Sequence, residues 1–267
     1  FLTEQLLYGP GAVMGLVGLV ALLVTRRFGW VRILGWVCLA GFAIVMGAHG
    51  KPYYIGPVYP ALMAAGAILL EGLRGWWGIA LRWGTVTVVI AFGVVTLPFG
   101  LPILSPEETA RYAAAAGVTS TVRTNTGEVA LLPQDYGDML YWEEKVAAIA
   151  RVYDSLRPGE RSEAVILAAN YGQAGAIDFY GDRFGLPRAI SPVGSYWFFG
   201  PGEKPGRVLI TIGVSREDLE EGYGDVRTAD SLHYPMAVEE EQNLEILVAR
   251  FPRMTLQEVW SRFAGQH

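Results

Sequence analysis

Charged residues are scarce in the first part of the sequence. Residues 1–101 contain two acidic and six basic residues, whereas residues 102–267 contain 24 acidic and 15 basic ones. Averages over the whole chain, 52% hydrophobic and 18% charged, therefore blend two regions of different character. The second region is acidic and has no basic cluster. Nucleic acid is therefore not expected as a partner, because neutralising its phosphates requires concentrated Lys and Arg.

Cysteine and histidine are equally scarce. Cys38 is the single cysteine, so the chain cannot form an intramolecular disulfide, and a cysteine-based metal site is disfavoured. His233 and His267 are too isolated in the sequence to indicate a metal site. The sequence shows no Ser/His/Asp set and no zinc spacing. We therefore predict no catalytic and no metal-binding residues.

A secretory leader is not evident either. The sequence opens Phe-Leu-Thr-Glu, without a basic n-region or a cleavage motif, so we do not expect a signal peptide here. The expectation is instead that the sequence is the C-terminal portion of a longer membrane protein. The alternative is that Phe1 is a processed N-terminus.

Long uncharged stretches are abundant. A transmembrane helix needs about 20 predominantly apolar residues. Four stretches approach or reach that length: Leu6–Thr25, Ile33–Ala48, Pro52–Leu70 and Trp83–Ser105. Pro, Gly and Tyr in the first half make the third the weakest of these. The sequence thus predicts an α-helical membrane bundle of about four helices over residues 1–105. A small soluble α/β domain over residues 106–267 is expected to follow it.

Basic residues in the short loops predict the orientation of these spans. Five of the six lie in or beside the first and last loops, at positions 26, 27, 32, 74 and 82, and only Lys51 lies in the middle loop. The first and last loops are therefore expected in the cytoplasm. The C-terminal domain is then expected in the periplasm or extracellular space, attached to the inner or plasma membrane. Trp76, Trp77 and Trp83 fit an interfacial aromatic belt.

Alternating helix and strand patterns follow in the second region. Helices are expected over residues 107–117, 142–156, 173–181 and 254–263, and after an N-cap at Ser215. Apolar runs predict strands over Ala164–Ala169, Leu186–Ile190 and Arg207–Ile212. A parallel or mixed sheet with helices on both faces accounts for this order. Four acidic residues near the start of the second helix show no acid/base spacing and are interpreted as a solvated helix start: Asp135, Asp138, Glu143 and Glu144.

The segment HGKPYYIGPVYP, residues 49–60, combines a cation with three tyrosines at the end of two predicted spans. A lysine at the membrane edge beside tyrosine hydroxyls is suited to holding a phosphate or pyrophosphate, while a lipid tail lies along the helices. The alternative is an ordinary interfacial anchor, since Lys extends to the headgroups and Tyr favours them.

Two segments of the soluble region are candidate sugar sites. Asn170 and Tyr171 follow a predicted strand and open a helix, where α/β folds often bind phosphates or sugars, although the GxGxxG spacing is absent and a tight turn is the favoured interpretation. Tyr196 and Trp197 lie in the aromatic segment SYWFFGPG. Such rings are suited to stacking on a sugar, and they are equally suited to capping the core or resting against a membrane.

These segments resemble a known family. HGKPYYIGPVYPALMAAGAILLE is similar to the late transmembrane motif of family 39 glycosyltransferases. This GT-C family includes dolichyl-phosphate-mannose protein mannosyltransferases and the lipid A aminoarabinose transferase. The opening FLTEQLLYGPGAVMGLVGLVALL resembles the family's preceding span. The blocks LPQDYGDMLYWEE, NYGQAGAIDFYG and GLPRAISPVGSYWFFGPG resemble the extracytoplasmic domain of one bacterial branch. The resemblance extends over about residues 1–215.

The resemblance implies transfer of a sugar from a polyprenyl-phosphate carrier to an extracytoplasmic acceptor. Lys51 would neutralise the carrier phosphate, with Tyr53, Tyr54, Tyr59 and His49 around it. The family's catalytic acid lies in its first external loop, and the only acids in residues 1–101, Glu4 and Glu71, do not match that position. The 267-residue chain is therefore expected to be inactive alone. No cofactor is specified, and the resemblance allows a divalent metal in the parent enzyme.

Two other functions remain open. A non-catalytic, membrane-anchored glycan- or protein-binding domain is the main alternative. A role as a transporter subunit is a less favoured hypothesis, because charged residues are almost absent from the predicted spans. The sequence upstream of Phe1 would decide between the enzyme and the binding protein.

Overall fold

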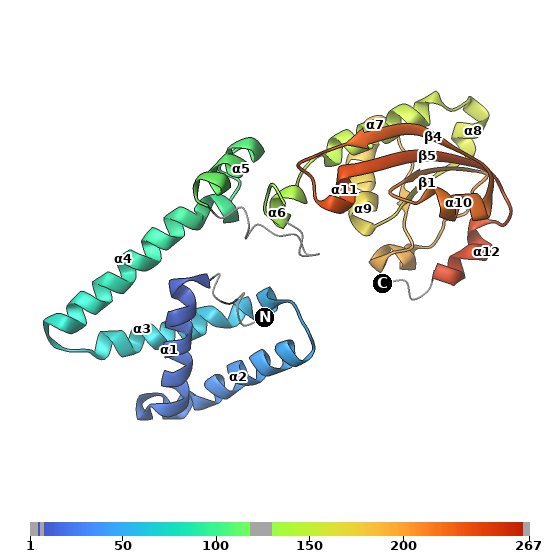
Figure 1. Cartoon of the computed structure of the whole chain (residues 1–267). Helices are drawn as coiled ribbons and strands as arrows, with labels where there is room; N and C mark the ends of the chain where they lie inside the picture. Colours follow the sequence, from blue (N-terminus) through green and yellow to red (C-terminus); the bar gives the residue numbers. More distant parts are fainter. Residues whose placement is uncertain (1–4, 6–7, 118–129, 264–267) are drawn as a thin grey trace. The chain divides into compact units, whose positions relative to one another are not determined.

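A computed structural model describes residues 5, 8–117 and 130–263, which form two compact units, Phe1–Ile103 and Leu104–His267. We refer to these as the N-terminal and C-terminal units and describe each by itself. The N-terminal unit is helical (Figure 1). Its elements are α1 (Pro10–Val24), η2 (Arg26–Val31), α2 (Arg32–Gly47), η3 (Pro52–Val58), α3 (Tyr59–Gly72) and α4 (Gly75–Gly100).

Within the described residues, three helical stretches are long and apolar enough to cross a membrane: Arg26–Gly47, Tyr53–Gly72 and Gly75–Gly100. The expected first span, Leu6–Thr25, begins at two residues outside the described part of the chain, and its described helix α1 is shorter than a span. Gly9 has a φ of 53° and Pro10 starts α1, while Thr25 is extended and ends it after 15 residues. At 1.5 Å per residue such a helix covers about 22 Å, less than the roughly 30 Å of a hydrocarbon core.

The last span also differs from the prediction. Helix α4 begins at Gly75 rather than Trp83 and ends at Gly100 rather than Ser105, because Leu101 is extended with φ −131° and ψ 135°. Arg82 therefore lies within the helix, where its Nε donates to the Gly78 carbonyl. The loop between α3 and α4 shrinks to Leu73 and Arg74.

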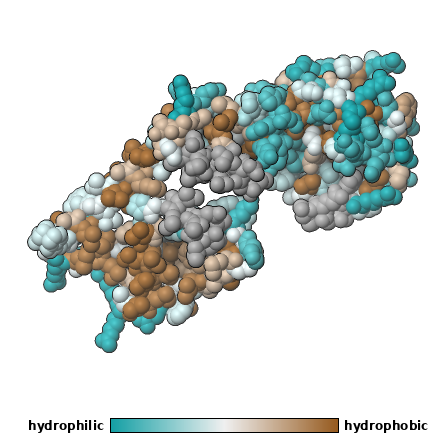
Figure 2. Space-filling model, viewed as in Figure 1, coloured by the Kyte–Doolittle hydropathy of each residue, from teal (hydrophilic) through white to brown (hydrophobic). Residues whose placement is uncertain are grey.

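Helices α1 and α3 pack with their backbones in contact. A Cβ at Gly18 would lie only 1.7 Å from the Leu62 carbonyl oxygen, and one at Gly66 only 2.7 Å from that of Met14. Around this crossing the small core is completed by Ala21, Leu22 and Ala65. By contrast, only 17% of the apolar window of Arg26–Gly47 and 6% of that of Gly75–Gly100 are buried. Many apolar side chains of the N-terminal unit are therefore exposed, and hydrophobic residues are prominent on the face of this unit that Figure 2 shows.

The C-terminal unit is an α/β fold built on one mixed sheet of five strands, ordered β2-β1-β3-β5-β4. Strands β2, β1 and β3 are parallel, and β5 and β4 add to them antiparallel. The strands are β1 (Ala164–Ala168), β2 (Ala189–Ile190), β3 (Val208–Ile212), β4 (Tyr223–His233) and β5 (Asn243–Pro252). The helices are α5 (Pro106–Ala115), α6 (Gln134–Gly137), α7 (Trp142–Ser155), α8 (Pro158–Glu163), α9 (Tyr171–Tyr180), η5 (Gly181–Phe184), η6 (Gly194–Phe199), α10 (Arg216–Gly222), α11 (Glu239–Gln242), α12 (Leu256–Trp260) and η7 (Ser261–Phe263).

Helices cover both faces of this sheet, as the sequence predicted (Figure 1). On one face, Ile166 and Ile210 pack against α7 and α9, including Ile149 and Ile177. Alternate strand residues point to the other face and pack against α10 and α12. Three expected strands and the N-cap of α10 at Ser215 are confirmed, although β2 is only two residues long. The β4–β5 hairpin was not predicted.

Candidate functional site

The turn after α2 is built from two local motifs. His49 lies in the left-handed region at φ 53°. Its N–H donates to the Met46 carbonyl, and that of Gly50 donates to the Val45 carbonyl. This is a Schellman ending, which usually has Gly at the position of His49. Lys51 is then extended, and Pro52 begins η3. The chain thus reverses sharply with Lys51 at the bend. We call residues 49–54 the lysine turn.

The lysine turn presents one cation and two phenol rings to its surroundings. Lys51 is exposed, and Tyr53 and Tyr54 are 57% and 58% exposed. The two rings contact edge to face with centroids 4.7 Å apart, and the Lys51 ammonium lies 5.9 Å from the Tyr53 centroid. No ion pair joins Lys51 to a carboxylate in the described part of the chain. The ammonium is therefore open to an anionic group from outside the chain.

Tyr59 lies apart from these exposed groups. It is buried, its ring stacks on Tyr8 at 4.4 Å, and its hydroxyl donates to Gln5 at 2.9 Å. The structure thus assigns Tyr59 to the packing between α3 and the N-terminal residues. It does not place Tyr59 in the exposed group around Lys51, where the resemblance implied it would be. His49 is in the lysine turn and exposed.

In the C-terminal unit, Asn170 is an N-cap. Its Oδ1 accepts the Gln173 N–H at 2.8 Å and so satisfies the first turn of α9. This strand-to-helix junction lies at the carboxyl ends of the parallel strands. From there β1 leads to α9 on one face and β3 leads to α10 on the other. Open α/β sheets often bind ligands in such a crevice.

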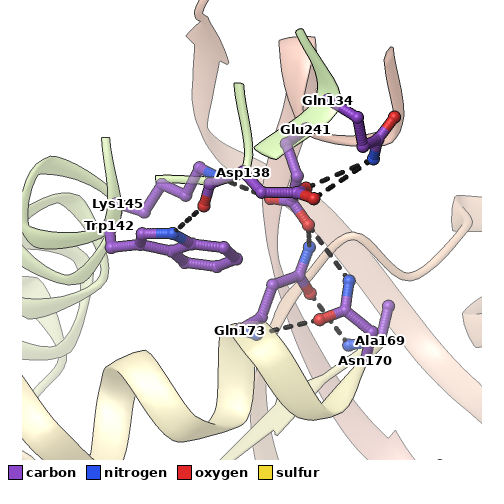
Figure 3. A network of polar contacts seen from close by, with 8 residues as sticks. All are labelled: Gln134, Asp138, Trp142, Lys145, Ala169, Asn170, Gln173 and Glu241. Atoms are coloured by element: carbon purple, nitrogen blue, oxygen red, sulfur yellow. Dashed lines mark hydrogen bonds and ion pairs between the residues drawn. The ribbon is translucent and has the colours of Figure 1, made fainter. Parts of the chain in front are cut away.

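Here the crevice is filled by a polar network from the protein itself (Figure 3). The Lys145 ammonium lies 2.7 Å from Glu241 Oε2, with the two side chains 3% and 6% exposed. Glu241 Oε1 accepts from the amides of Asn170 at 3.0 Å and Gln173 at 2.9 Å. Gln173 also accepts the Ala169 N–H at 3.1 Å. Three separate elements, α7, α9 and α11, therefore meet at one carboxylate.

The network leaves no room for a phosphate. A Cβ at Gly213, directly after β3, would lie 2.8 Å from the Gln173 amide nitrogen, so this amide fills the gap between the ends of β1 and β3. The space lined by Trp142, Lys145 and Gln173 holds no cavity of water size. A bound anion would also face the Glu241 carboxylate. The tight-turn interpretation of Asn170 and Tyr171 is therefore the one that the geometry favours.

Acidic residues around the network have different environments. Glu143 and Glu144 lie in the first turn of α7, as expected of a solvated helix start. Asp138 is exposed as well, although desolvation, followed by the charges of nearby carboxylates, raises its pKa, while hydrogen bonds from Gln134 at 3.2 and 3.4 Å oppose this shift. The Trp142 indole N–H donates to the backbone carbonyl of Asp138. These bonds fix α6 against the start of α7.

The aromatic segment forms η6. Tyr196 donates its hydroxyl to Asp178 at 3.2 Å, and Trp197 and Trp260 each donate an indole N–H to the other's carbonyl, at 3.4 and 3.1 Å. Both predicted sugar contacts are therefore partly buried and tied into the fold. Phe198 and Phe199, which were not singled out, are 78% and 77% exposed.

Sequence reasoning missed Lys145, Gln173 and Glu241. Lys145 and Glu241 are separated by 96 residues, so no spacing connects them. His233 pairs with Asn243, whereas His267 lies outside the described residues. The described ranges contain no group of three His, Cys, Asp or Glu side chains that could hold a metal ion. Comparisons with protein-family models, curated proteins and solved structures find no match to this chain.

Proposed function

We propose that the N-terminal unit spans a membrane and that the lysine turn binds the phosphate of a polyprenyl-phosphate sugar carrier. The chain would be the C-terminal part of an integral-membrane glycosyltransferase with an extracytoplasmic acceptor. Support comes from three apolar helical stretches of membrane length and from Lys51 at the end of two of them, which is exposed and forms no ion pair among the described residues. The choice of reaction, transfer of a sugar from the carrier to the acceptor, rests on the resemblance to family 39 enzymes.

Lys51 is the observation that carries this proposal. Placed at a membrane edge, its ammonium would attract an anionic headgroup, and the hydroxyl of Tyr54 would donate a hydrogen bond to a phosphate oxygen. The apolar surfaces of α2 and α3 beside the lysine turn would accommodate a polyprenyl chain, because most of their side chains are not packed within this unit. Tyr59 would act only by fixing the start of α3 through its packing on Tyr8.

The test is carrier binding by the full chain in nanodiscs. Lys51→Ala is expected to weaken binding of a polyprenyl phosphate about tenfold, equivalent to about 1.4 kcal/mol. Lys51→Arg should retain most of the affinity. Arg74→Ala is the matched control, because Arg74 is also an exposed cation at a helix start. The uncharged polyprenol should bind all four chains equally weakly. Equal affinity of the parent chain and Lys51→Ala for the phosphate would refute the proposed role.

Activity is a separate question. The family's catalytic acid has no counterpart among Glu4 and Glu71, so we expect no sugar transfer by the 267-residue chain alone. Transfer from a polyprenyl-phosphate sugar by this purified chain would contradict that expectation. Carrier binding without transfer is the expected combination.

A further inference from the structure

Phe198 and Phe199 are held in an exposed position by a rigid frame. The preceding residue, Trp197, exchanges indole-to-carbonyl hydrogen bonds with Trp260, which is 7% exposed. Tyr196 is tied to Asp178 on α9. Glycines with φ of 62° and 77°, Gly194 and Gly200, bracket the segment. The rings of Tyr196 and Trp197 are thus held against the fold, whereas the rings of Phe198 and Phe199 are exposed to solvent.

Tyr171 extends this exposed surface. It is 63% exposed, and its ring lies against Gly194, where a Cβ would come within 3.3 Å. The Phe199 and Tyr196 rings meet edge to face with centroids 5.5 Å apart. We call the exposed side chains of Tyr171, Phe198 and Phe199 the aromatic surface. Water-soluble domains seldom expose several large aromatic side chains together, and such patches mark binding sites.

Helix α7 begins beside this surface. Trp142, the first residue of α7, lies against Gly172, where a Cβ would come within 3.2 Å of its ring. Gly172 is next to Tyr171 in α9.

We propose that the aromatic surface binds the headgroup region of the lipid bilayer, with Phe198 and Phe199 inserted among the upper acyl chains. This inference rests on the proposed membrane crossing of the N-terminal unit. Covalent attachment to membrane helices keeps the local concentration of the surface near the bilayer high, so a weak intrinsic affinity is sufficient. Aromatic side chains favour this interface because they combine an apolar body with polar or polarisable edges.

A lipid surface fits better than a glycan. Sugar sites combine a stacking ring with convergent polar groups that are free to bind hydroxyls. Asp178, the carboxylate beside the neighbouring Tyr196 ring, already accepts the Ala189 N–H at 2.8 Å and the Tyr196 hydroxyl at 3.2 Å. Phe198 and Phe199 themselves offer only apolar surface.

The experiment uses the full chain in liposomes, with Cys38→Ala removing the native thiol. Ser195→Cys, an exposed position in η6, carries an environment-sensitive fluorophore. We expect blue-shifted emission and quenching by lipids brominated near the headgroup. The double substitution Phe198→Ser/Phe199→Ser should reduce the quenching at least twofold. Phe251→Ser is the matched control, because Phe251 is 71% exposed but lies on β5, near the end that pairs with the start of β3. It should leave the quenching unchanged.

Several outcomes separate this proposal from the one on which it rests. A chain that resists carbonate extraction but shows no quenching overturns lipid binding by the aromatic surface and leaves the membrane crossing intact. A chain that carbonate extracts overturns the membrane crossing itself. A fluorophore that responds to soluble oligosaccharide and not to lipid identifies a glycan site and overturns the proposal. Phe199→Trp should keep the quenching, because an indole ring also favours the interface, and thermal unfolding of the double variant checks that it is folded.

Discussion

The Lys145 ammonium and the Glu241 carboxylate lie 2.7 Å apart in the interior of the C-terminal unit, where almost no solvent reaches either group. The Trp142 ring covers the ammonium, with its centroid 4.1 Å from Nζ. Two side-chain amides complete the bonding of the carboxylate. This ion pair connects α11, at the tip of the β4–β5 hairpin, to α7.

Removing one partner of this pair should destabilise the unit strongly. Glu241→Gln leaves the Lys145 charge buried and unpaired, which costs about 3–5 kcal/mol in comparable cases. The double substitution Lys145→Met/Glu241→Gln removes both charges and should recover much of that loss. Thermal unfolding of the four chains of this cycle measures the coupling. Glu143→Gln, which breaks the exposed pair with Arg183, should change stability by less than about 1 kcal/mol. Equal losses in the single and double variants would contradict the buried-charge explanation.

The close crossing of α1 and α3 gives a second prediction. Gly18→Val should separate these helices, because the first added carbon already overlaps the Leu62 carbonyl. Overpacking of this kind costs about 1–3 kcal/mol or more. Gly84→Val in α4 is the control, since no atom beyond the neighbouring residues and the helix's own backbone lies within 4 Å of a Cβ there. Loss of helical circular dichroism on heating in detergent would show the difference. Similar melting temperatures for the two variants would mean that the crossing contributes little.

The parts of the fold that sequence predicted are those with local signals. The continuous apolar runs at β1 and β3 and the Ser215 cap needed no knowledge of distant residues. The hairpin was missed because β4 is an edge strand rich in polar residues, and it is recognisable only from its pairing with β5. The first predicted span, Leu6–Thr25, includes Leu6 and Leu7, which lie outside the described residues, and in the described part of the chain Gly9 and Pro10 set the start of α1.

The candidate sites divide in the same way. The lysine turn is contiguous in sequence, so Lys51, Tyr53 and Tyr54 could be grouped without a structure. The inward position of Tyr59 depends on Tyr8 and Gln5, which are distant in the sequence. The polar network that fills the crevice beside Asn170 likewise depends on Glu241, which is 71 residues away in the sequence.

Membrane orientation can be tested with single cysteines in a Cys38→Ala background. One apolar helical stretch, Tyr53–Gly72, separates Lys51 from Arg74, so Lys51→Cys and Arg74→Cys should react with a membrane-impermeant maleimide from opposite sides. A cysteine at the exposed Ser231 should react from the same side as Lys51→Cys. Sealed vesicles of both orientations provide the measurement. Labelling of positions 51 and 74 from one side would show that the intervening helix does not cross the bilayer.

Tyr223 should make the C-terminal unit sensitive to alkali. Burial raises its pKa to about 12, and its hydroxyl donates to the Gly206 carbonyl at 3.1 Å. An unfolded tyrosine titrates near pH 10, so the folded state holds this proton more tightly. The resulting stabilisation is complete below about pH 10 and is lost as the pH rises towards 12, with a total of about 3 kcal/mol.

Comparison with Tyr223→Phe isolates this contribution, because the other titrating groups are shared. At pH 8 the variant should be less stable by about 1 kcal/mol, since it lacks the hydrogen bond to Gly206. Between pH 10 and 12 the parent chain should lose stability faster, so that the difference shrinks and then reverses. Chemical denaturation across this range measures both chains. A difference that stays constant with pH would show that the Tyr223 hydroxyl ionises equally in the folded and unfolded states.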